Sequence, residues 1–195
     1  MKAVPPVQSI LFVALSGIGN FLMQSPAITL SKQHFPQARI TVWVAPRGTK
    51  PLAQNVSAVD EVIEAPIKMS VSHHLHHVWH LSRQRFQVGI VLSPGQLIKS
   101  AAYLYLAGIQ TRIGGRYPFR GDKASGFLLT HPVVELPGIH DIEQNVRLLT
   151  PLGITDSVRE YDLSLPAAAH DEAARLLTTF NIPGDKRLIG FHPGC

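Results

Sequence analysis

The chain has 195 residues, enough for one large domain or slightly more than one. Hydrophobic residues make up 45% of it and charged residues 16%, which excludes a disordered chain and indicates a packed globular protein. The formal net charge of +5 favours an anionic partner, such as a phosphorylated glycan, a nucleotide or an acidic membrane surface. The basic residues are scattered and form no known nucleic-acid motif, so we expect no nucleic-acid partner.

The compartment is indicated by cysteine usage and by the lack of long apolar runs. Cys195 is the only cysteine, so no intrachain disulfide can form and a reducing cytosol is compatible. No apolar run reaches the ~18 residues of a membrane-spanning helix. Residues 10–15 resemble the apolar part of a signal peptide, but no small-residue cleavage site follows them. We expect a cytoplasmic protein and leave open a peripheral contact with the inner face of a membrane.

The first predicted elements are a strand over residues 10–15, a turn over 16–20 and a helix over 21–34. This is the opening of a βαβ unit. Glycine suits such a turn because it lacks a Cβ and can adopt positive φ. Backbone N–H groups at the start of the helix would attract an anion in the crevice at the carboxyl ends of the strands. The expected site residues are those of the turn: Ser16, Gly17, Ile18, Gly19 and Asn20.

Further strands and helices alternate along the rest of the chain. Strands are predicted at 39–44, 62–63, 88–92 and 112–114, as an irregular edge strand within 127–136, and at 187–191. Helices are predicted at 49–55, 96–107, 140–152 and 167–180, and residues 69–84 form a helix or a loop dense in histidine. This alternation predicts an α/β fold: a Rossmann-like, doubly wound parallel sheet with helices on both faces.

The domain organisation follows from the last predicted strand. A strand followed by a glycine turn is how a βαβ unit opens, and here it lies at the end of the sequence. We therefore expect one domain over residues 1–155. Residues 156–195 would form an interdomain linker helix and the first strand of a second, truncated domain, with Cys195 at its end by accident of truncation.

A group of histidines raises the question of a metal site. His73 and His77, like His76 and His80, would be one turn apart on a helix, and His74 lies between them. No acidic or cysteine ligand accompanies them, so a solvated face or a loop contacting acceptor phosphates is the alternative. We expect no metal.

Basic residues lie at the start of the strand predicted at 112–114 and in the loop after it. Arg112, Arg116, Arg120 and Lys123 could clamp an anionic acceptor, or they could form an ordinary soluble surface. Beyond them, His140, Asp141 and Glu143 open a predicted helix, where the two acids would act mainly as caps and complement the helix dipole.

The glycines at 17 and 19 could also belong to a dinucleotide-binding motif. That fingerprint needs a third glycine where Leu22 stands, and an acidic residue near the end of the second strand, where residues 44–46 read V-A-P. Both are absent, so we expect no nicotinamide and no other cofactor. A purely structural turn remains the other interpretation.

Several motifs together carry a resemblance to a known family. They are I-L-F-V-A-L-S-G-I-G-N at 10–20, S-P-A at 25–27, F-P-Q-A-R-I-T-V-W-V at 35–44, V-D-E-V-I at 59–63, T-R-I-G-G at 111–115, H-D-I-E-Q-N-V-R-L-L-T-P-L-G-I at 140–154 and L-I-G-F-H-P-G at 188–194. In this order, over nearly the whole chain, they resemble the N-terminal half of glycosyltransferase family 9, the ADP-heptose:lipopolysaccharide heptosyltransferases and their relatives.

The resemblance implies a GT-B architecture, in which two Rossmann-like domains face a cleft. It implies an inverting transfer, without a required metal, from an ADP-sugar in the C-terminal domain to a lipopolysaccharide core acceptor, a lipid A–Kdo or inner-core glycan, in the N-terminal domain. Asn20 occupies the position of the family's catalytic aspartate, and an amide cannot accept a proton. The alternative is therefore a truncated, non-catalytic domain that binds an anionic glycan. The resemblance also places His140 at the acceptor and His192, Pro193 and Gly194 at the nucleotide-sugar.

Overall fold

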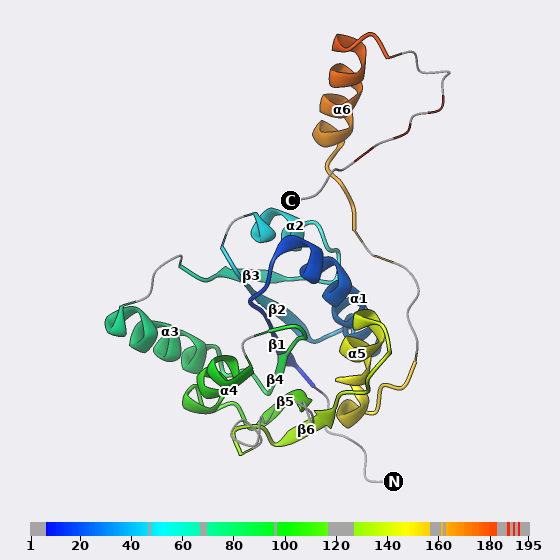
Figure 1. Ribbon diagram of the computed structural model, residues 1–195. Helices are drawn as coiled ribbons and strands as arrows, with labels where there is room; N and C mark the ends of the chain where they lie inside the picture. The colour runs from blue at the N-terminus through cyan, green and yellow to red at the C-terminus, as the bar shows by residue number, and fades with distance from the viewer. Residues whose placement is uncertain are drawn as a thin grey trace. The chain divides into compact units, whose positions relative to one another are not determined.

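The computed structural model describes residues 7–46, 48–66, 70–95, 97–116, 127–156, 161, 163–182, 187, 189 and 191 (Figure 1). The chain divides into two compact units, Met1–Leu163 and Ser164–Cys195. The first unit holds the sheet. The second holds one described helix, α6 (Ala167–Thr179), whose side chains are exposed. The division predicted between residues 155 and 156 stays a prediction.

The sheet has six parallel strands in the order β3-β2-β1-β4-β5-β6. They are β1 (Ser9–Ala14), β2 (Arg39–Val44), β3 (Glu61–Glu64), β4 (Val88–Val91), β5 (Thr111–Arg116) and β6 (His131–Val134). The chain first winds from β1 out to β3, then crosses back and winds from β4 out to β6. The order therefore reverses between β1 and β4, and in open α/β sheets a crevice forms at such a reversal, beyond the carboxyl ends of the strands.

Helices cover both faces because the buried strand residues alternate. Ile10, Phe12 and Ala14 of β1 pack into one core with residues of α1 (Ile18–His34), α2 (Thr49–Gln54) and the segment following α5 (Asp141–Arg147). Leu11 and Val13 pack into a second core with residues of α3 (Val71–Gln84) and α4 (Leu97–Leu106). In Figure 1, α1 and α5 lie on one side of the sheet and α3 and α4 on the other. The Rossmann-like fold predicted from the sequence is confirmed.

Three element boundaries differ from the predictions. Helix α1 begins at Ile18, three residues early, because Gly17 in extended backbone already serves as its N-cap. The helix predicted over 140–152 is two elements, since α5 ends at Arg147 and a 3₁₀ helix, Thr150–Leu152, follows around Pro151, which lacks an N–H to donate. The strand predicted at 187–191 is not found at 187, 189 or 191, and 188 and 190 lie outside the described residues.

An aromatic contact attaches α3 to the sheet. The His77 ring stacks on buried Trp43 of β2 with 5.6 Å between ring centroids, and Tyr103 of α4 meets the same indole edge-on at 4.9 Å. Burial lowers the pKa of His77 below its ordinary value, and the neighbouring imidazoles lower it further. Neutral His77 is therefore the packed form. No helix among the described residues is long and apolar enough to cross a bilayer.

The stacked His77 predicts a pH dependence of stability. Because its pKa is lowered by folding, the unfolded chain binds a proton below pH 6.5 that the folded chain does not. Stability should fall as the pH drops below 6.5 and be insensitive to this group above it. Replacing His77 with Phe should reduce the loss in free energy of unfolding between pH 7.5 and 5.5, measured by denaturant titration. His131→Phe, at an exposed site, is the control, and equal slopes in both variants would contradict the prediction.

Candidate functional site

The turn predicted as the site lies at the switch point of the sheet. Residues 15–17 connect β1 to α1 beside the loop that follows β4, where the strand order reverses. Gly17, Ile18 and Gly19 are exposed, while Ser16 and Asn20 are half-buried. The five predicted turn residues therefore lie at the carboxyl edge of the sheet, beside the point where the strand order reverses.

The two glycines of the turn do not serve the purpose expected of them. Gly17 has φ −71° and ψ 173°, and Gly19 lies in the first turn of α1, so neither adopts positive φ. A Cβ added at either residue would meet no atom within 4 Å. Neither backbone conformation nor packing requires glycine here. What the glycines provide is open space above the start of α1, so a ligand could approach the backbone closely.

The start of α1 offers unpaired backbone donors to this space. No side chain caps the helix, and its first turn contains no acidic residue. The first intrahelical bond runs from Phe21 N to Gly17 O at 3.0 Å, which leaves the N–H groups of residues 18–20 without helical partners. Together with the positive end of the helix dipole, these donors favour an anionic or hydroxyl-bearing ligand.

Buried Gln24 connects the turn to the end of β4. Its Nε2 lies 3.2 Å from Ser16 Oγ and donates to the carbonyl oxygens of Ser93 at 3.2 Å and Pro94 at 3.4 Å. Gln24 is one helical turn beyond Asn20 on the same face of α1. The Asn20 side chain makes no hydrogen bond within the part of the chain that the structure describes, and it is free to meet a ligand.

Asn145 of α5 holds the loop after β4 from the other side. Its Oδ1 accepts from Ser93 N at 2.8 Å, and its Nδ2 donates to Ser93 O at 2.7 Å and to Asp141 O at 2.8 Å. Asn145 is fully buried and bonds both backbone groups of Ser93, whose carbonyl oxygen it shares with Gln24. The loop is therefore fixed by side chains from two helices.

A carboxylate completes this network. Ser93 Oγ donates to Glu135 Oε1 at 2.9 Å, and Glu135 follows directly after β6. The Glu135 side chain crosses over Gly115 of β5, where an added Cβ would lie 2.7 Å from Oε1. A larger residue at 115 would therefore displace this carboxylate from its present position.

Sequence reasoning missed these four network residues: Gln24, Ser93, Glu135 and Asn145. One signal was present, because Gln24 and Asn145 are uncharged polar residues on the faces of helices that pack against the core. Glu135 gave no such signal, since its place depends on the pairing of β5 with β6.

The predicted basic clamp is not assembled among the described residues. Arg112 lies near the start of β5, at the opposite edge of the sheet, and its guanidinium donates to the carbonyl oxygens of Leu128 at 2.6 Å and Ile109 at 2.5 Å. Arg116 ends β5, is exposed and lies at the carboxyl edge. The other members of the predicted clamp and nucleotide-sugar site lie outside the described residues: Arg120, Lys123, His192, Pro193 and Gly194.

His140 and the histidines of α3 have local structural roles. His140 is the N-cap of α5, and its Nδ1 accepts from Ile142 N at 3.2 Å. His73 forms a capping box with Ser70, and His74 forms a hydrogen bond with the Tyr103 hydroxyl. Within the described ranges, no three histidine, cysteine or acidic side chains are grouped so that they could hold a metal ion.

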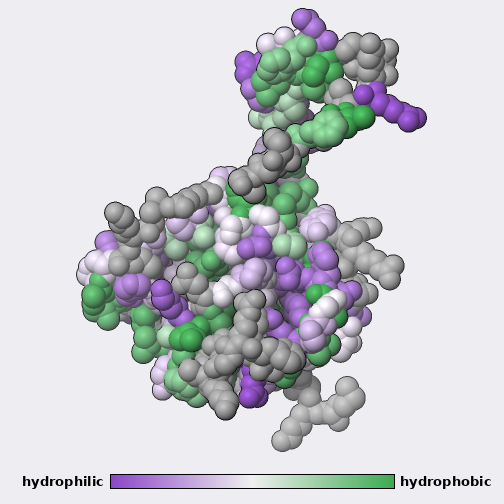
Figure 2. All heavy atoms as spheres, viewed as in Figure 1, coloured by the Kyte–Doolittle hydropathy of each residue, from purple (hydrophilic) through white to green (hydrophobic). Residues whose placement is uncertain are grey.

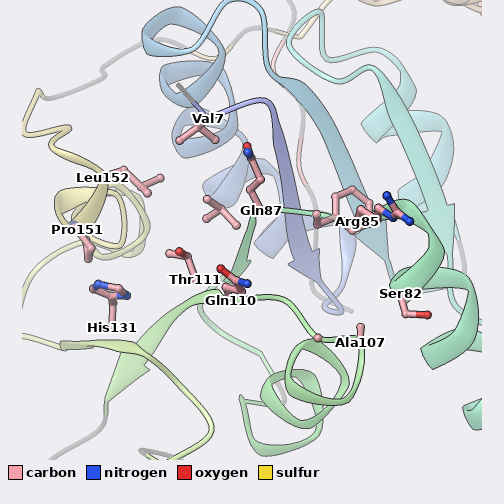
Figure 3. A pocket seen from close by; sticks show the side chains of 13 residues that line it. Val7, Ser82, Arg85, Gln87, Ala107, Gln110, Thr111, His131, Pro151 and Leu152 are labelled. Carbon is pink, nitrogen blue, oxygen red and sulfur yellow. The ribbon is translucent and has the colours of Figure 1, made fainter. Parts of the chain in front are cut away.

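A cavity of about 560 Å³ lies elsewhere, at the amino-terminal edge of the sheet. Figure 3 shows Gln87, Gln110 and Thr111 projecting into it from the segments that begin β4 and β5, with His131 and Arg85 at its margins. Ligands of open α/β sheets bind at the other edge. The amide–carboxylate network is also absent here, so we place the candidate site at the switch point.

The network predicts a large cost for removing the buried amide. Asn145→Ala removes two buried hydrogen bonds that hold the loop, the one from Ser93 N and the one to Ser93 O, and removing a buried partner costs about 1–3 kcal/mol. The free energy of unfolding should fall by at least about 2 kcal/mol, measured by urea titration. Asn55→Ala is the matched control, because Asn55 Nδ2 donates to Pro51 O at an exposed site. Equal losses in the two variants would show that the amide does not fix this loop.

Comparison with known proteins supports the resemblance seen in the motifs. No protein-family model matches the chain. The chain is 24% identical over 163 residues to lipopolysaccharide heptosyltransferase 3 of Escherichia coli, a match that covers 82% of this chain and 47% of that protein. The chain therefore spans about half the length of this relative.

Solved structures of similar proteins share the fold. A glycosyl transferase family 9 protein from Veillonella parvula superposes with a TM-score of 0.80 at 17% identity, over 96% of this chain and 54% of the other. ADP-heptose lps heptosyltransferase II of E. coli gives 0.67 at 22% identity, over 96% and 55%. E. coli heptosyltransferase WaaC, solved with ADP, gives 0.65 at 18% identity, over 79% and 50%.

These likenesses confirm the predicted fold class, a Rossmann-like domain as found in GT-B glycosyltransferases. In sequence and in fold, the chain resembles heptosyltransferase-like glycosyltransferases of family 9, and it spans about half of their length.

Proposed function

We propose that the chain is the acceptor-binding part of an inverting, heptosyltransferase-like glycosyltransferase. The donor would be an ADP-sugar and the acceptor a lipopolysaccharide core glycan. The observation that carries the proposal is the exposed start of α1 at the switch point, where backbone donors and Asn20 lie beside a loop held by Gln24 and Asn145. The substrates are proposed from the resemblance of the chain to heptosyltransferases.

The acceptor would lie against the start of α1. Gly17 and Gly19 leave room for a sugar ring, and the free N–H groups of the first turn can donate to its hydroxyl or phosphate oxygens. Arg116, at the same edge of the sheet, would supply a positive charge for a phosphorylated core glycan. We omit Arg112 from this site because its guanidinium is engaged at the opposite edge.

Asn20 would hold the acceptor hydroxyl in line for attack on the anomeric carbon of the donor. Its amide can donate to and accept from that hydroxyl but cannot take up the proton. We propose that Glu135 takes the proton. What supports this role is that Glu135 is joined through Ser93 to Gln24, one turn beyond Asn20, and so belongs to the network beneath the crevice.

The ADP-sugar site is assigned to the part of the enzyme that the relatives have and this chain does not cover. In an inverting transfer the new glycosidic bond forms as the bond from C1 to the diphosphate breaks. The leaving diphosphate carries the electron pair and needs donors and positive charge around it. His192, Pro193 and Gly194 stay predicted as the first of these donor-site residues.

The proposal predicts salt-dependent acceptor binding through Arg116. Replacing Arg116 and Arg120 with Ala should weaken binding of a phosphorylated inner-core glycan about tenfold at low salt, since each exposed pair contributes up to about 1 kcal/mol. The difference should shrink as salt screens these charges. Isothermal titration calorimetry measures both effects. Arg85→Ala, at the opposite edge of the sheet, is the control. An unchanged affinity in the double variant would contradict a role of Arg116 and Arg120 in acceptor binding.

The proton acceptor can be tested by rescue in a full-length enzyme that contains this chain. Glu135→Gln should lower kcat about 10²-fold with little change in acceptor KM. Adding Asn20→Asp to Glu135→Gln should restore turnover, because a carboxylate would again face the acceptor hydroxyl.

Glu143→Gln, at an exposed position on α5, is the matched control for the rescue experiment. An unchanged kcat in Glu135→Gln would overturn the role of Glu135. Glycan binding by a full-length enzyme that shows no turnover, even with Asn20→Asp, would favour a non-catalytic binding domain.

A further inference from the structure

We propose that the outer surface of α3 and α4 docks on an anionic bilayer. This inference does not depend on the transferase proposal, because it rests on a surface distinct from the crevice. The two helices cover one face of the sheet and contact each other through His74 and Tyr103. Their outward side chains combine exposed hydrophobic groups with positive charge.

An apolar stripe runs along α3. Val71, Leu75 and Trp79 follow one another at i, i+4 and i+8, so they share one side of the helix. Their side chains are 75%, 66% and 54% exposed. The opposite side of the helix, with buried Leu81, packs on the sheet, so the stripe does not serve the core. Helix α4 adds exposed apolar residues on the same face of the sheet: Ile98, Tyr105 and Leu106.

Neither α3 nor α4 carries an acidic residue. Between Glu64 and Asp122 the sequence contains no aspartate or glutamate. Within α3 the guanidinium of Arg83 lies 5.1 Å from the centre of the Trp79 ring, at the edge of the stripe. Three further cations belong to these helices or lie against them: Lys99 of α4 and the α3 C-cap residue Arg85 are exposed, and the Arg112 guanidinium lies 5.3 Å from the centre of the Tyr105 ring of α4. Figure 2 shows hydrophobic and hydrophilic side chains side by side over α3 and α4, at the left of the view.

This combination selects one kind of partner. Helices that lie in a membrane interface carry an apolar side bearing Trp or Leu and a polar side rich in Lys and Arg. Trp and Tyr prefer the depth of the lipid headgroups, and each nearby Lys or Arg adds about 1 kcal/mol of attraction to anionic lipids. A second copy of the chain would bring the same positive face and be repelled. Charge complementarity therefore favours an anionic lipid surface.

The two tryptophans make the contact directly measurable. Trp79 is 54% exposed, whereas Trp43 is 1% exposed and packed against His77 and Tyr103. On adding vesicles of phosphatidylcholine with 30% phosphatidylglycerol, chosen by analogy with anionic leaflets, emission should shift to the blue through Trp79. Brominated lipid should quench that emission, and raised salt should reverse both effects.

The decisive variant replaces Leu75 and Trp79 with Gln. Co-sedimentation with the same vesicles should fall about tenfold or more. Phe127→Gln with Leu136→Gln, which removes two exposed apolar side chains elsewhere, is the matched control and should bind as the unchanged chain does. Circular dichroism checks that α3 is still folded.

Three outcomes would overturn the proposal. They are equal binding to vesicles of pure phosphatidylcholine, vesicle binding that survives in the Leu75 and Trp79 variant, and a dimer in solution that is lost in that variant. None of these outcomes would affect acceptor binding at the crevice, so failure here is distinguishable from failure of the transferase proposal.

Discussion

The structure of the crevice depends on how the loop after β4 is held. The Asn145 side chain of α5 accepts a hydrogen bond from the backbone N–H of Ser93 and donates one to its carbonyl oxygen. Gln24 of α1 donates to the same carbonyl oxygen, and the Ser93 hydroxyl donates to Glu135. Two helices and two strands thus meet at one residue. Because these groups are buried or half-buried, breaking one bond leaves the others strained or unpaired. The network therefore sets the relative positions of the elements that surround the open turn.

The two faces of the sheet carry different kinds of side chains. The face covered by α1 and α5 carries the helix start, the amide side chains and the crevice. The face covered by α3 and α4 carries an aromatic core around Trp43 and, on its outside, the exposed apolar stripe.

Local patterns in the sequence were sufficient for the fold and for the turn. Alternating β-branched runs marked the strands, and the glycines at 17 and 19 marked the crevice, because both signals lie within a few neighbouring residues. The floor of the crevice was not predictable in this way. Ser93 and Asn145 are 52 residues apart, and Ser93 and Glu135 are 42 apart, so their contact exists only once the sheet is assembled. Arg112 failed as a clamp residue because it lies near the start of its strand, at the amino edge of the sheet, where its guanidinium donates to backbone carbonyls.

Gly19 is a position where neither the packing nor the backbone conformation of the folded chain requires glycine. Inside a helix, glycine destabilises by roughly 0.5–1 kcal/mol relative to alanine, because it loses more conformational freedom on folding. Here nothing within 4 Å would obstruct a methyl group, and φ is ordinary for any residue. The chain thus keeps a residue that weakens its first helix for no benefit to its own packing. If the turn binds an acceptor as proposed, this position is a stability–activity trade-off: selection for thermal stability alone would replace the glycine, and selection for ligand binding would retain it.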